Sequence, residues 1–185
     1  SISNYVGLQD KAVNKAYSDI DFGVGIRVLK GDQIGYSFTE ELTLRAMKLA
    51  AKTAAAIARS GKTAPPQALK LHEIPNYYPI QTPWEQVGID QKIPMLQTIN
   101  DKVFDLDSRI IKSNIWFNTD TSTVLIATSE GRVVFDYQPM VRCNVSCTAE
   151  QNGQRETNRF NLSGRQGIEF FTPDNVNRLA SEAVK

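Results

Sequence analysis

Residues 22–59 read FGVGIRVLKGDQIGYSFTEELTLRAMKLAAKTAAAIAR, and this stretch decides the fold class. Its first half predicts a β-hairpin: strands at 23–29 and 34–38 flank a turn at 30–33, where Gly and Asp tolerate turn geometry. Its second half predicts one long amphipathic helix, because small and apolar residues recur at helical spacing. These residues are Leu42, Ala46, Leu49, Ala50, Ala56 and Ile57. Such a unit has to bury its apolar stripe, so we expect the helix to pack on the sheet.

The ends of this helix carry their own signals. Ser37 and Glu40 can form a capping box at its start, and Thr39 is a competing N-cap with Glu40 and Glu41 in the first turn. Ser60-Gly61 is the expected end, because glycine commonly follows the last helical residue.

Composition bounds the class of protein. A chain of 185 residues suggests one domain or two small ones, and we expect one. The hydrophobic fraction is 41%, and no apolar run reaches membrane-spanning length, so we expect a soluble protein that has no membrane partner. The net charge of +1, from 21 basic and 20 acidic residues, lacks the footprint of a nucleic-acid binder. We expect a cytoplasmic location, while export stays open because the natural N-terminus is not seen.

The segments on either side of residues 22–59 are less regular. Residues 1–6 read as a strand without its beginning, and 10–16 as a loop or an edge strand. Five of the eight prolines lie at 65–83, which predicts an extended surface segment. Aromatic residues in and just after it either pin the segment to the core or form a docking surface for a partner. They are Tyr77, Tyr78 and Trp84.

A second helix is predicted at about 90–105, with Pro94 in its first turn. The period then changes to two, which predicts five antiparallel strands at 108–118, 123–128, 132–138, 140–150 and 154–161. Turns are expected at 118–120, 129–131 and 151–153. A glycine-bearing loop at 163–167 leads to a strand at 168–171, and a last helix runs from Thr172-Pro173 to Lys185 without a stop signal.

These elements predict an α+β fold. We expect an antiparallel β-sheet, built from the first hairpin and the later strands, with two main helices packed on it and a truncated C-terminal helix.

The search for catalytic chemistry finds few candidates. His72 is the only histidine and cannot supply a multi-histidine zinc site, so a surface or interface histidine is expected. Cys143 and Cys147 would lie on one face of a strand, about 13 Å apart, which favours buried hydrophobic residues over a disulfide or a metal site. We therefore predict no catalytic residue and no metal ligand in this chain.

The first hairpin carries a structural motif of glycines. Gly23 and Gly25 are expected to admit the close approach of a helix or neighbouring strand, with Arg27 on the same face and Gly31 in the turn. They lie within a strand pattern, so they do not form a phosphate-binding loop.

Two blocks of the sequence resemble the TldD/PmbA proteins, also called modulators of DNA gyrase. The first is FGVGIRVLKGDQIGYSFTEELT with the alanine-rich helix that follows it. The second is ATSEGRVVFDYQPMVRCNVSCTAEQNGQRETNRFNLSGRQGIEFF, residues 127–171. Its family-like features are the Gly131 turn, Pro139 followed by Arg142, the Gly153 turn, and Gly164-Arg165-x-Gly167.

The resemblance implies a function for the intact protein. The family comprises zinc metallopeptidases that degrade or mature small peptides as homo- or heterodimers. Their metal is bound by HExxxH and a later cysteine of a C-terminal domain, and neither motif occurs in this chain. The resemblance therefore implies that 1–185 is a single, non-catalytic N-terminal domain, a fragment that helps to enclose the active site, with the zinc in the missing domain. The alternative is a free-standing binding or assembly module without catalytic activity.

The resemblance also points to residues that contact a peptide or the catalytic domain: Gly164, Arg165, Gly167 and Arg142. The glycines would allow positive φ or close approach to another chain, and the arginine offers a fork of donors to carboxylates or peptide carbonyls. In that role the loop is expected to be exposed and mobile in this chain, for want of its partner. The alternative is an ordinary loop in which Arg165 is solvated or pairs with a nearby carboxylate such as Glu169. The expected partners are the protein's own catalytic domain, a second TldD/PmbA-type chain and a peptide, without direct nucleic-acid contact.

Overall fold

The computed structural model of this chain describes residues 1–59, 65 and 67–185. These residues form two compact units. The first comprises Ser1–Ile20, Leu71–Ile126 and Val133–Lys185, and the second comprises Asp21–Lys70 and Ala127–Arg132. The early hairpin thus belongs to a unit of its own.

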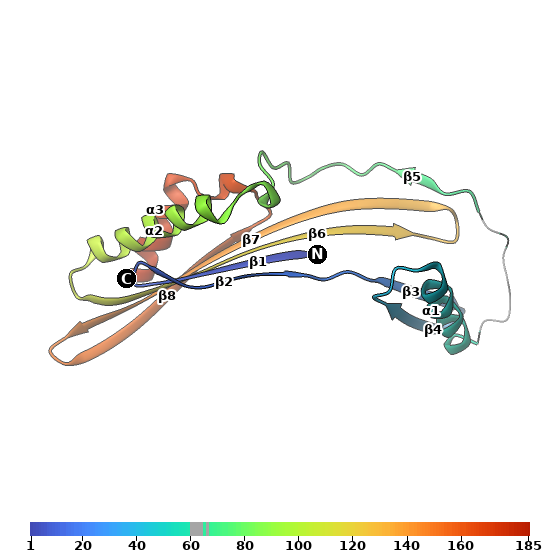
Figure 1. Cartoon of the computed structure of the whole chain (residues 1–185), viewed down its shortest axis with the longest axis horizontal. Coiled ribbons are helices and arrows are strands. Elements are labelled where there is room, and N and C mark those ends of the chain that lie inside the picture. Colours follow the sequence, from blue (N-terminus) through green and yellow to red (C-terminus); the bar gives the residue numbers. More distant parts are fainter. Residues whose placement is uncertain (60–64, 66) are drawn as a thin grey trace. The chain divides into compact units, whose positions relative to one another are not determined.

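The larger sheet has six strands and supplies most of the first unit (Figure 1). They are β1 (Ile2–Gln9), β2 (Ala12–Ile20), β5 (Lys70–His72), β6 (Ile110–Ala127), β7 (Arg132–Gln151) and β8 (Gln154–Gly164). Their order is β2-β1-β6-β7-β5, and β8 also pairs with β7. β1 is antiparallel to both of its neighbours, and β8 is antiparallel to β7. The α+β class is confirmed.

Three long strands replace the five short ones that the sequence predicts. The expected turn at 118–120 is wrong: Asn118 and Asp120 lie within β6 opposite Tyr5 and Ser3, and the Ser3 hydroxyl donates to the Asp120 carboxylate at 2.6 Å. Cross-strand partners therefore override the local turn signal. β7 likewise continues through Pro139.

The other two predicted turns are confirmed. Gly131 follows β6 with a φ of +86°, and Asn152 and Gly153 join β7 to β8 with φ values of +54° and +77°. Glycine and asparagine tolerate this left-handed region better than other residues do.

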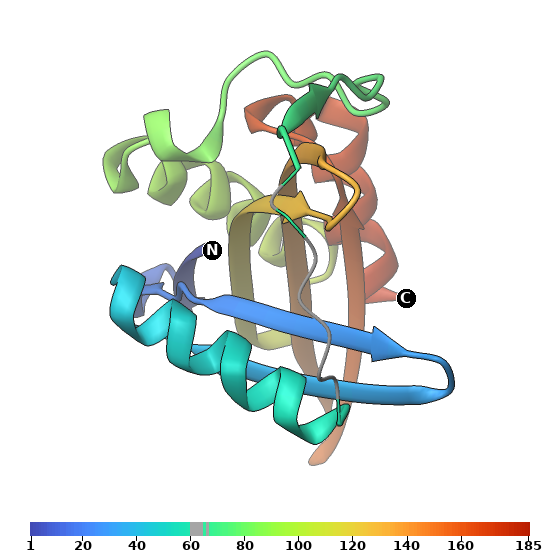
Figure 2. The same ribbon diagram turned by 90° about the vertical axis from the view of Figure 1, so that its right-hand side faces the viewer.

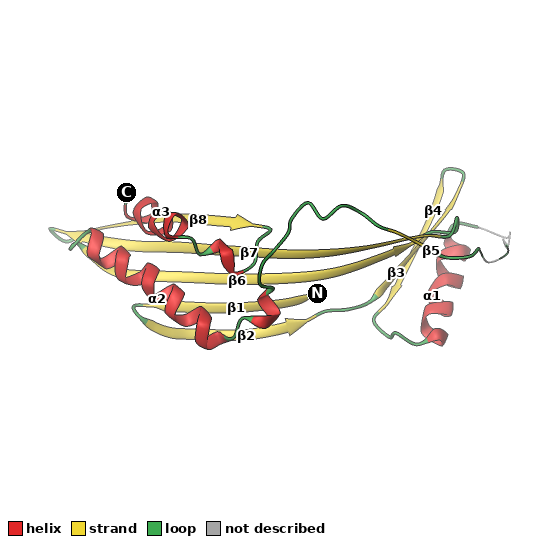
Figure 3. Cartoon of the chain, turned by 90° about the horizontal axis from the view of Figure 1, so that it is seen from above, coloured by secondary structure: helices red, strands yellow, loops and turns green. Residues whose placement is uncertain are grey.

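Two helices, α2 (Ile89–Leu106) and α3 (Pro173–Val184), lie over the same face of this sheet (Figure 3). The predicted start of the last helix is confirmed, and Thr172 is its N-cap, because its hydroxyl oxygen accepts from the Asn175 amide at 3.1 Å. Pro94, however, lies inside α2, beyond the first turn. The core between helices and sheet includes Leu8, Trp84, Leu96, Ile99, Val103, Ile115, Phe117, Val145, Phe170 and Leu179.

Two short 3-10 helices, η1 (Trp84–Gln86) and η2 (Ile168–Phe170), complete the first unit. The predicted strand at 168–171 is wrong. The Phe170 amide donates to the Gly167 carbonyl at 3.0 Å, so the chain closes a tight turn there instead of extending.

The cysteine and histidine predictions are confirmed. Cys143 and Cys147 are free and buried on one face of β7, and burial raises the pKa of Cys143 to about 12. The Cys147 thiol donates to the Ala183 carbonyl of α3 at 2.8 Å. His72 is exposed on β5.

The second unit is a hairpin with one helix along it (Figure 2). β3 (Val24–Lys30) and β4 (Gln33–Thr39) form a separate two-stranded sheet, with Gly31 at a φ of +60° in the turn. The hairpin prediction is confirmed, whereas its expected place in the main sheet is wrong. β3 and β4 bond only to each other among the strands that the structure describes.

Helix α1 (Leu44–Ile57) begins later than the sequence predicts. Its N-cap is Thr43, whose side-chain oxygen accepts from the Ala46 amide at 3.2 Å. Ser37 and Thr39 are strand residues of β4, and the Thr39 hydroxyl oxygen accepts from the Glu41 amide instead. The expected end at Ser60-Gly61 lies outside the described residues.

The face of α1 that packs on the hairpin consists of alanines. Ala50, Ala54 and Ala58 are buried, whereas Leu42, Leu49 and Ile57, expected in the apolar stripe, are exposed. The reason is Gly35 of β4, where an added Cβ would lie 1.9 Å from the Ala54 carbonyl oxygen. At such close approach only small side chains fit between helix and strand.

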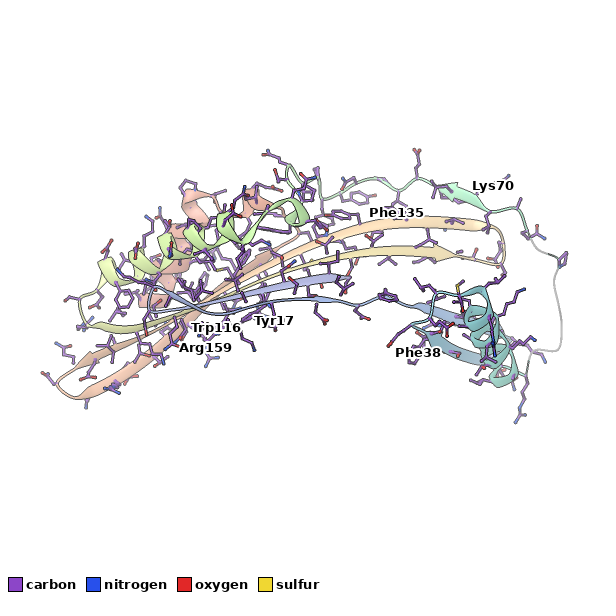
Figure 4. All side chains as sticks on the ribbon, viewed as in Figure 1. Tyr17, Phe38, Lys70, Trp116, Phe135 and Arg159 are labelled. Carbon is purple, nitrogen blue, oxygen red and sulfur yellow. The ribbon has the colours of Figure 1, made fainter. Side chains whose placement is uncertain are left out.

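The glycines of β3 lie away from this crossing. Gly25 and Arg27 are on the exposed face of the hairpin, and a Cβ on Gly25 would meet the side chain of Tyr36. A Cβ on Gly23 would lie 3.1 Å from the Thr39 carbonyl oxygen of the neighbouring strand. The same exposed face carries Leu29, Ile34, Tyr36 and Phe38, the last labelled in Figure 4.

Candidate functional site

A cleft of about 530 Å³ lies in the first unit. Its walls come from the proline-rich segment, from β7 and from the loop after β8. The lining residues are Ile74, Pro75, Asn76, Tyr77, Tyr78, Ile80, Phe135, Asp136, Tyr137 and Arg165. Figure 4 labels Phe135 on β7. Four aromatic rings with one cation and one carboxylate are the kind of lining that binds an amphipathic ligand.

Arg165 is the cation of this cleft. Its guanidinium lies over the ring of Tyr78, with its central carbon 4.5 Å from the ring centre, a cation–π contact. Arg165 forms no ion pair with any residue that the structure describes. In particular, it does not pair with Glu169, which accepts from the Gly167 amide at 2.9 Å. The edge of the guanidinium therefore keeps donors for a carboxylate or a carbonyl.

The loop that carries Arg165 is held by its own chain. Gly164 ends β8 opposite Val141, and the indole N–H of Trp84 donates to the Gln166 carbonyl at 2.8 Å. Gly167 is buried, and a Cβ there would lie 2.2 Å from the Thr82 carbonyl oxygen. The expectation of an exposed loop is therefore wrong at Gly167, and the glycine serves close packing within the chain. Its φ of −86° requires no glycine.

The sequence leaves two roles open for the aromatic residues in and just after the proline-rich segment: pinning it to the core, or docking a partner. The structure assigns different residues to each. Trp84 is 1% exposed and packs edge-to-face on Phe117, so it pins the segment to the core. Tyr77 and Tyr78 are 77% and 49% exposed and line the cleft. They are available to a partner.

Tyr137, which lines the cleft, is hydrogen-bonded to an exposed carboxylate outside it. The hydroxyl of Tyr137 donates to a carboxylate oxygen of Glu85 at 3.0 Å, and burial together with this bond raises the pKa of Tyr137. The Lys92 amine lies 5.8 Å from the ring centre of Trp84. Burial lowers the pKa of Lys92, and the charge of Glu85 opposes this shift.

The structure does not bring all the predicted site residues together. Arg142 is exposed on β7, paired with Ser163, and does not line the cleft. Gly23, Gly25, Arg27 and Gly31 belong to the second unit. Sequence reasoning missed Phe135, Asp136 and Tyr137. The alternation of Phe135 and Tyr137 along one strand was a signal, but it did not reveal which segment would face them.

A second cleft of about 610 Å³ lies where β7, β8 and the end of α3 meet. Two of its charged groups satisfy each other, since Arg109 donates to both carboxylate oxygens of Asp107. These hydrogen bonds lower the pKa of Asp107 to about 2. Because Arg109 and Asp107 already satisfy each other, this cleft is the weaker candidate.

Metal ligands do not cluster in the described part of the chain. No group of three or more His, Cys, Asp and Glu side chains there could hold a metal ion, so these residues do not fit a zinc site.

Among the described residues, no helix is both long and apolar enough to cross a bilayer.

Two family models match this chain in succession. Residues 1–58 match the PmbA/TldA metallopeptidase domain 1, and residues 82–185 match the PmbA/TldA metallopeptidase central domain. The chain belongs to the TldD/PmbA family. The domain 1 match covers β1 to β4 and the hairpin unit's helix α1. The central-domain match covers α2, β6 to β8, the Arg165 loop and α3.

Relatives of the TldD/PmbA chain include proteins named metalloprotease TldD homologues. The one from Haemophilus influenzae is 26% identical over 166 residues, and the one from Buchnera aphidicola of Acyrthosiphon pisum is 24% identical over 164. Each match covers 89% of this chain and 34% of the relative. The chain thus spans about a third of the length of these relatives.

Two solved structures share the fold of this chain. A Thermotoga maritima protein named as a modulator of DNA gyrase superposes with a TM-score of 0.73 at 16% identity. TldE from Thermococcus kodakarensis superposes with a TM-score of 0.65 at 15% identity. Both matches cover 99% of this chain, and they cover 42% and 41% of those chains.

Proposed function

We propose that this chain is the non-catalytic N-terminal part of a TldD/PmbA-type zinc metallopeptidase that degrades or matures small peptides. The match of residues 82–185 to the central domain of a metallopeptidase family carries the proposal. The zinc and its ligands belong to a C-terminal domain outside this chain. The N-terminal part helps to enclose the active site and to form a homo- or heterodimer.

The aromatic cleft is the part that contacts the peptide or the catalytic domain. Tyr77, Tyr78 and Phe135 offer exposed rings to apolar side chains. Arg165 offers a preoriented guanidinium to a carboxylate or to peptide carbonyls. The arrangement binds and positions a chain segment, and the metal chemistry takes place elsewhere in the intact protein.

Replacement of Arg165 by alanine in the full-length protein is expected to raise KM for a peptide about tenfold and to leave kcat within about twofold. The lost hydrogen bonds to a charged or carbonyl group act on binding, and Arg165 stays away from the reacting atoms. Peptide cleavage kinetics measure both constants. Arg159→Ala, an exposed arginine of β8, is the matched control and should leave both unchanged. Unchanged KM, kcat and dimerisation in Arg165→Ala would reduce the loop to a connector.

The isolated chain of 185 residues is expected to bind no stoichiometric zinc, whereas the full-length protein holds about one zinc per chain. Metal analysis after dialysis measures both. One tightly held zinc per isolated chain, lost in His72→Ala, is the outcome that contradicts this prediction.

A second candidate is a free-standing binding or assembly module. The exposed apolar face of the β3–β4 hairpin favours it, since Leu29, Ile34, Tyr36 and Phe38 lie together on one side of a small sheet. The reading frame beyond Lys185 separates the two candidates. A downstream HExxxH supports the metallopeptidase, and a stop codon supports the module.

A further inference from the structure

Strand β2 is an open edge of the larger sheet. It pairs with β1 on one side and with no other strand that the structure describes. All nine of its residues are exposed, and none is a proline. The unpaired backbone groups of such an edge are a template for another strand, and proteins usually protect them.

Only one irregularity interrupts β2, and it lies toward one end. The register with β1 shifts between Gly7 and Leu8, so Asn14 has no partner there. From Lys15 to Ile20 the pairing is regular. Five central residues, 15–19, therefore offer a regular edge.

The side chains of this edge are arranged symmetrically about Tyr17. Lys15, Tyr17 and Asp19 are opposite Gly7, Tyr5 and Ser3, and they share the face turned away from α2 and α3, where Figure 4 labels Tyr17. Lys15 and Asp19 are the only charged residues of β2. One positive and one negative charge thus stand two residues on either side of Tyr17.

Neither charge is satisfied by an ion pair in the described part of the chain. The Lys15 amine lies over the rings of Tyr17 and Tyr5, at 5.0 and 5.8 Å from their centres. The two rings stack at 5.0 Å. The middle of the edge therefore carries an aromatic stack with a cation beside it.

We propose that two copies of this chain pair along β2, antiparallel, about a twofold axis at Tyr17. In this register Lys15 is opposite the partner's Asp19, and the symmetry makes the same pair twice. The two Tyr17 rings meet, which extends the Tyr5–Tyr17 stack across the interface. The main-chain groups of both edges become hydrogen-bonded in one continuous sheet.

Neighbouring registers lack this match. Centring the pair on Ala16 sets Lys15 opposite the partner's Tyr17. Centring it on Ser18 sets Tyr17 opposite the partner's Asp19 and sets Lys15 opposite the partner's Asp21, a residue beyond the end of β2. An extended peptide of unrelated sequence could use the same backbone groups but would not bring the complementary charges. The charge pattern therefore favours a second copy as the occupant.

This inference rests on one part of the proposed function, namely that two chains of this type form a dimer. Its test uses the full-length protein and a position-specific disulfide, which is independent of peptidase activity. Directly opposed residues of antiparallel strands have Cα atoms about 4.5–5.5 Å apart, within reach of a disulfide. Cys143 and Cys147 are buried. The protein without an added cysteine is the control, because any cross-link that it forms comes from the native cysteines.

Tyr17→Cys is expected to form a disulfide-linked dimer in most chains under mild oxidation. Lys15→Cys and Asp19→Cys alone should give less than about a tenth of that yield. In each case the same position of the partner chain lies about 13 Å away along the strands. A mixture of the Lys15→Cys and Asp19→Cys proteins should form the linked heterodimer. Equal yields at all three positions, no link at Tyr17→Cys, or a link to a different protein would overturn the pairing.

The charge match is tested in the Tyr17→Cys background. Lys15→Asp or Asp19→Lys should lower the cross-link yield at least fivefold, because each places like charges opposite each other twice. The two changes together restore opposite charges and should recover at least half of the yield. Failure of the double variant to recover, with circular dichroism unchanged, would overturn this register. Peptide cleavage by the same samples reports separately on the proposed function.

Discussion

Replacement of Gly35 by alanine is expected to destabilise the hairpin unit by about 3 kcal/mol. The added Cβ would lie 1.9 Å from the Ala54 carbonyl oxygen and 2.8 Å from the Ala58 amide nitrogen. Both are main-chain atoms of one helix segment, so no rotamer change relieves the overlap and α1 has to lift from β4. Its buried alanines then become exposed. Hydrogen exchange of the α1 amides, followed by mass spectrometry, measures the local loss of stability.

Gly25→Ala is the matched control on the opposite face of the same hairpin. Its Cβ would meet only the side chain of Tyr36, which is half exposed and can rotate away. We expect a change below about 1 kcal/mol, partly offset by the lower entropy of the unfolded chain. Equal exchange rates of α1 in the two variants would contradict the close crossing at Gly35.

Truncation of Trp84 to alanine is expected to cost the first unit about 3–5 kcal/mol of its free energy of unfolding. The ring is 1% exposed and lies 5.3 Å from the ring centre of Phe117 and 6.3 Å from that of Phe171. The change also removes the N–H that donates to the Gln166 carbonyl and so anchors the Arg165 loop. Denaturant unfolding followed by circular dichroism measures the global loss.

Loss of Trp84 also removes the hydrogen bond that holds the loop around Arg165, so this loop should become more accessible to a protease. Trypsin cleaves after arginine, so cleavage after Arg165 should accelerate in Trp84→Ala and, to a smaller extent, in Trp84→Phe, which keeps a ring but not the donor. Tyr77→Ala removes an exposed ring of the same segment and should change unfolding by less than about 0.5 kcal/mol. A stability loss in Tyr77→Ala as large as in Trp84→Ala would contradict the division of roles between them.

Several features of the fold follow from local pattern. The Lys30–Gln33 turn, the Thr172 cap and the Asn152-Gly153 turn are specified by residues adjacent in the chain. The alternation of Val141, Cys143, Val145 and Cys147 was enough to predict a buried strand face.

Prediction from local sequence is wrong where a segment distant in the chain determines the local structure. Asn118 to Asp120 have a turn composition, yet β1 pairs with them and keeps them in a strand. The long side chains of α1 fit an apolar stripe, yet the backbone of Gly35 approaches so closely that alanines take the buried face. Neither partner is visible in the local sequence.

The candidate site shows the same division. The sequence by itself predicted a glycine-bearing loop around Arg165 and an extended segment that carries Tyr77 and Tyr78. Only the tertiary structure decided that Arg165 stacks on Tyr78 and that Phe135 and Tyr137 share their cleft. Local sequence fixes turns, caps and periodicity because neighbouring residues make those contacts. A cleft assembled from residues 74–80, 135–137 and 165 depends on the packing of segments far apart in the chain, which no local pattern encodes.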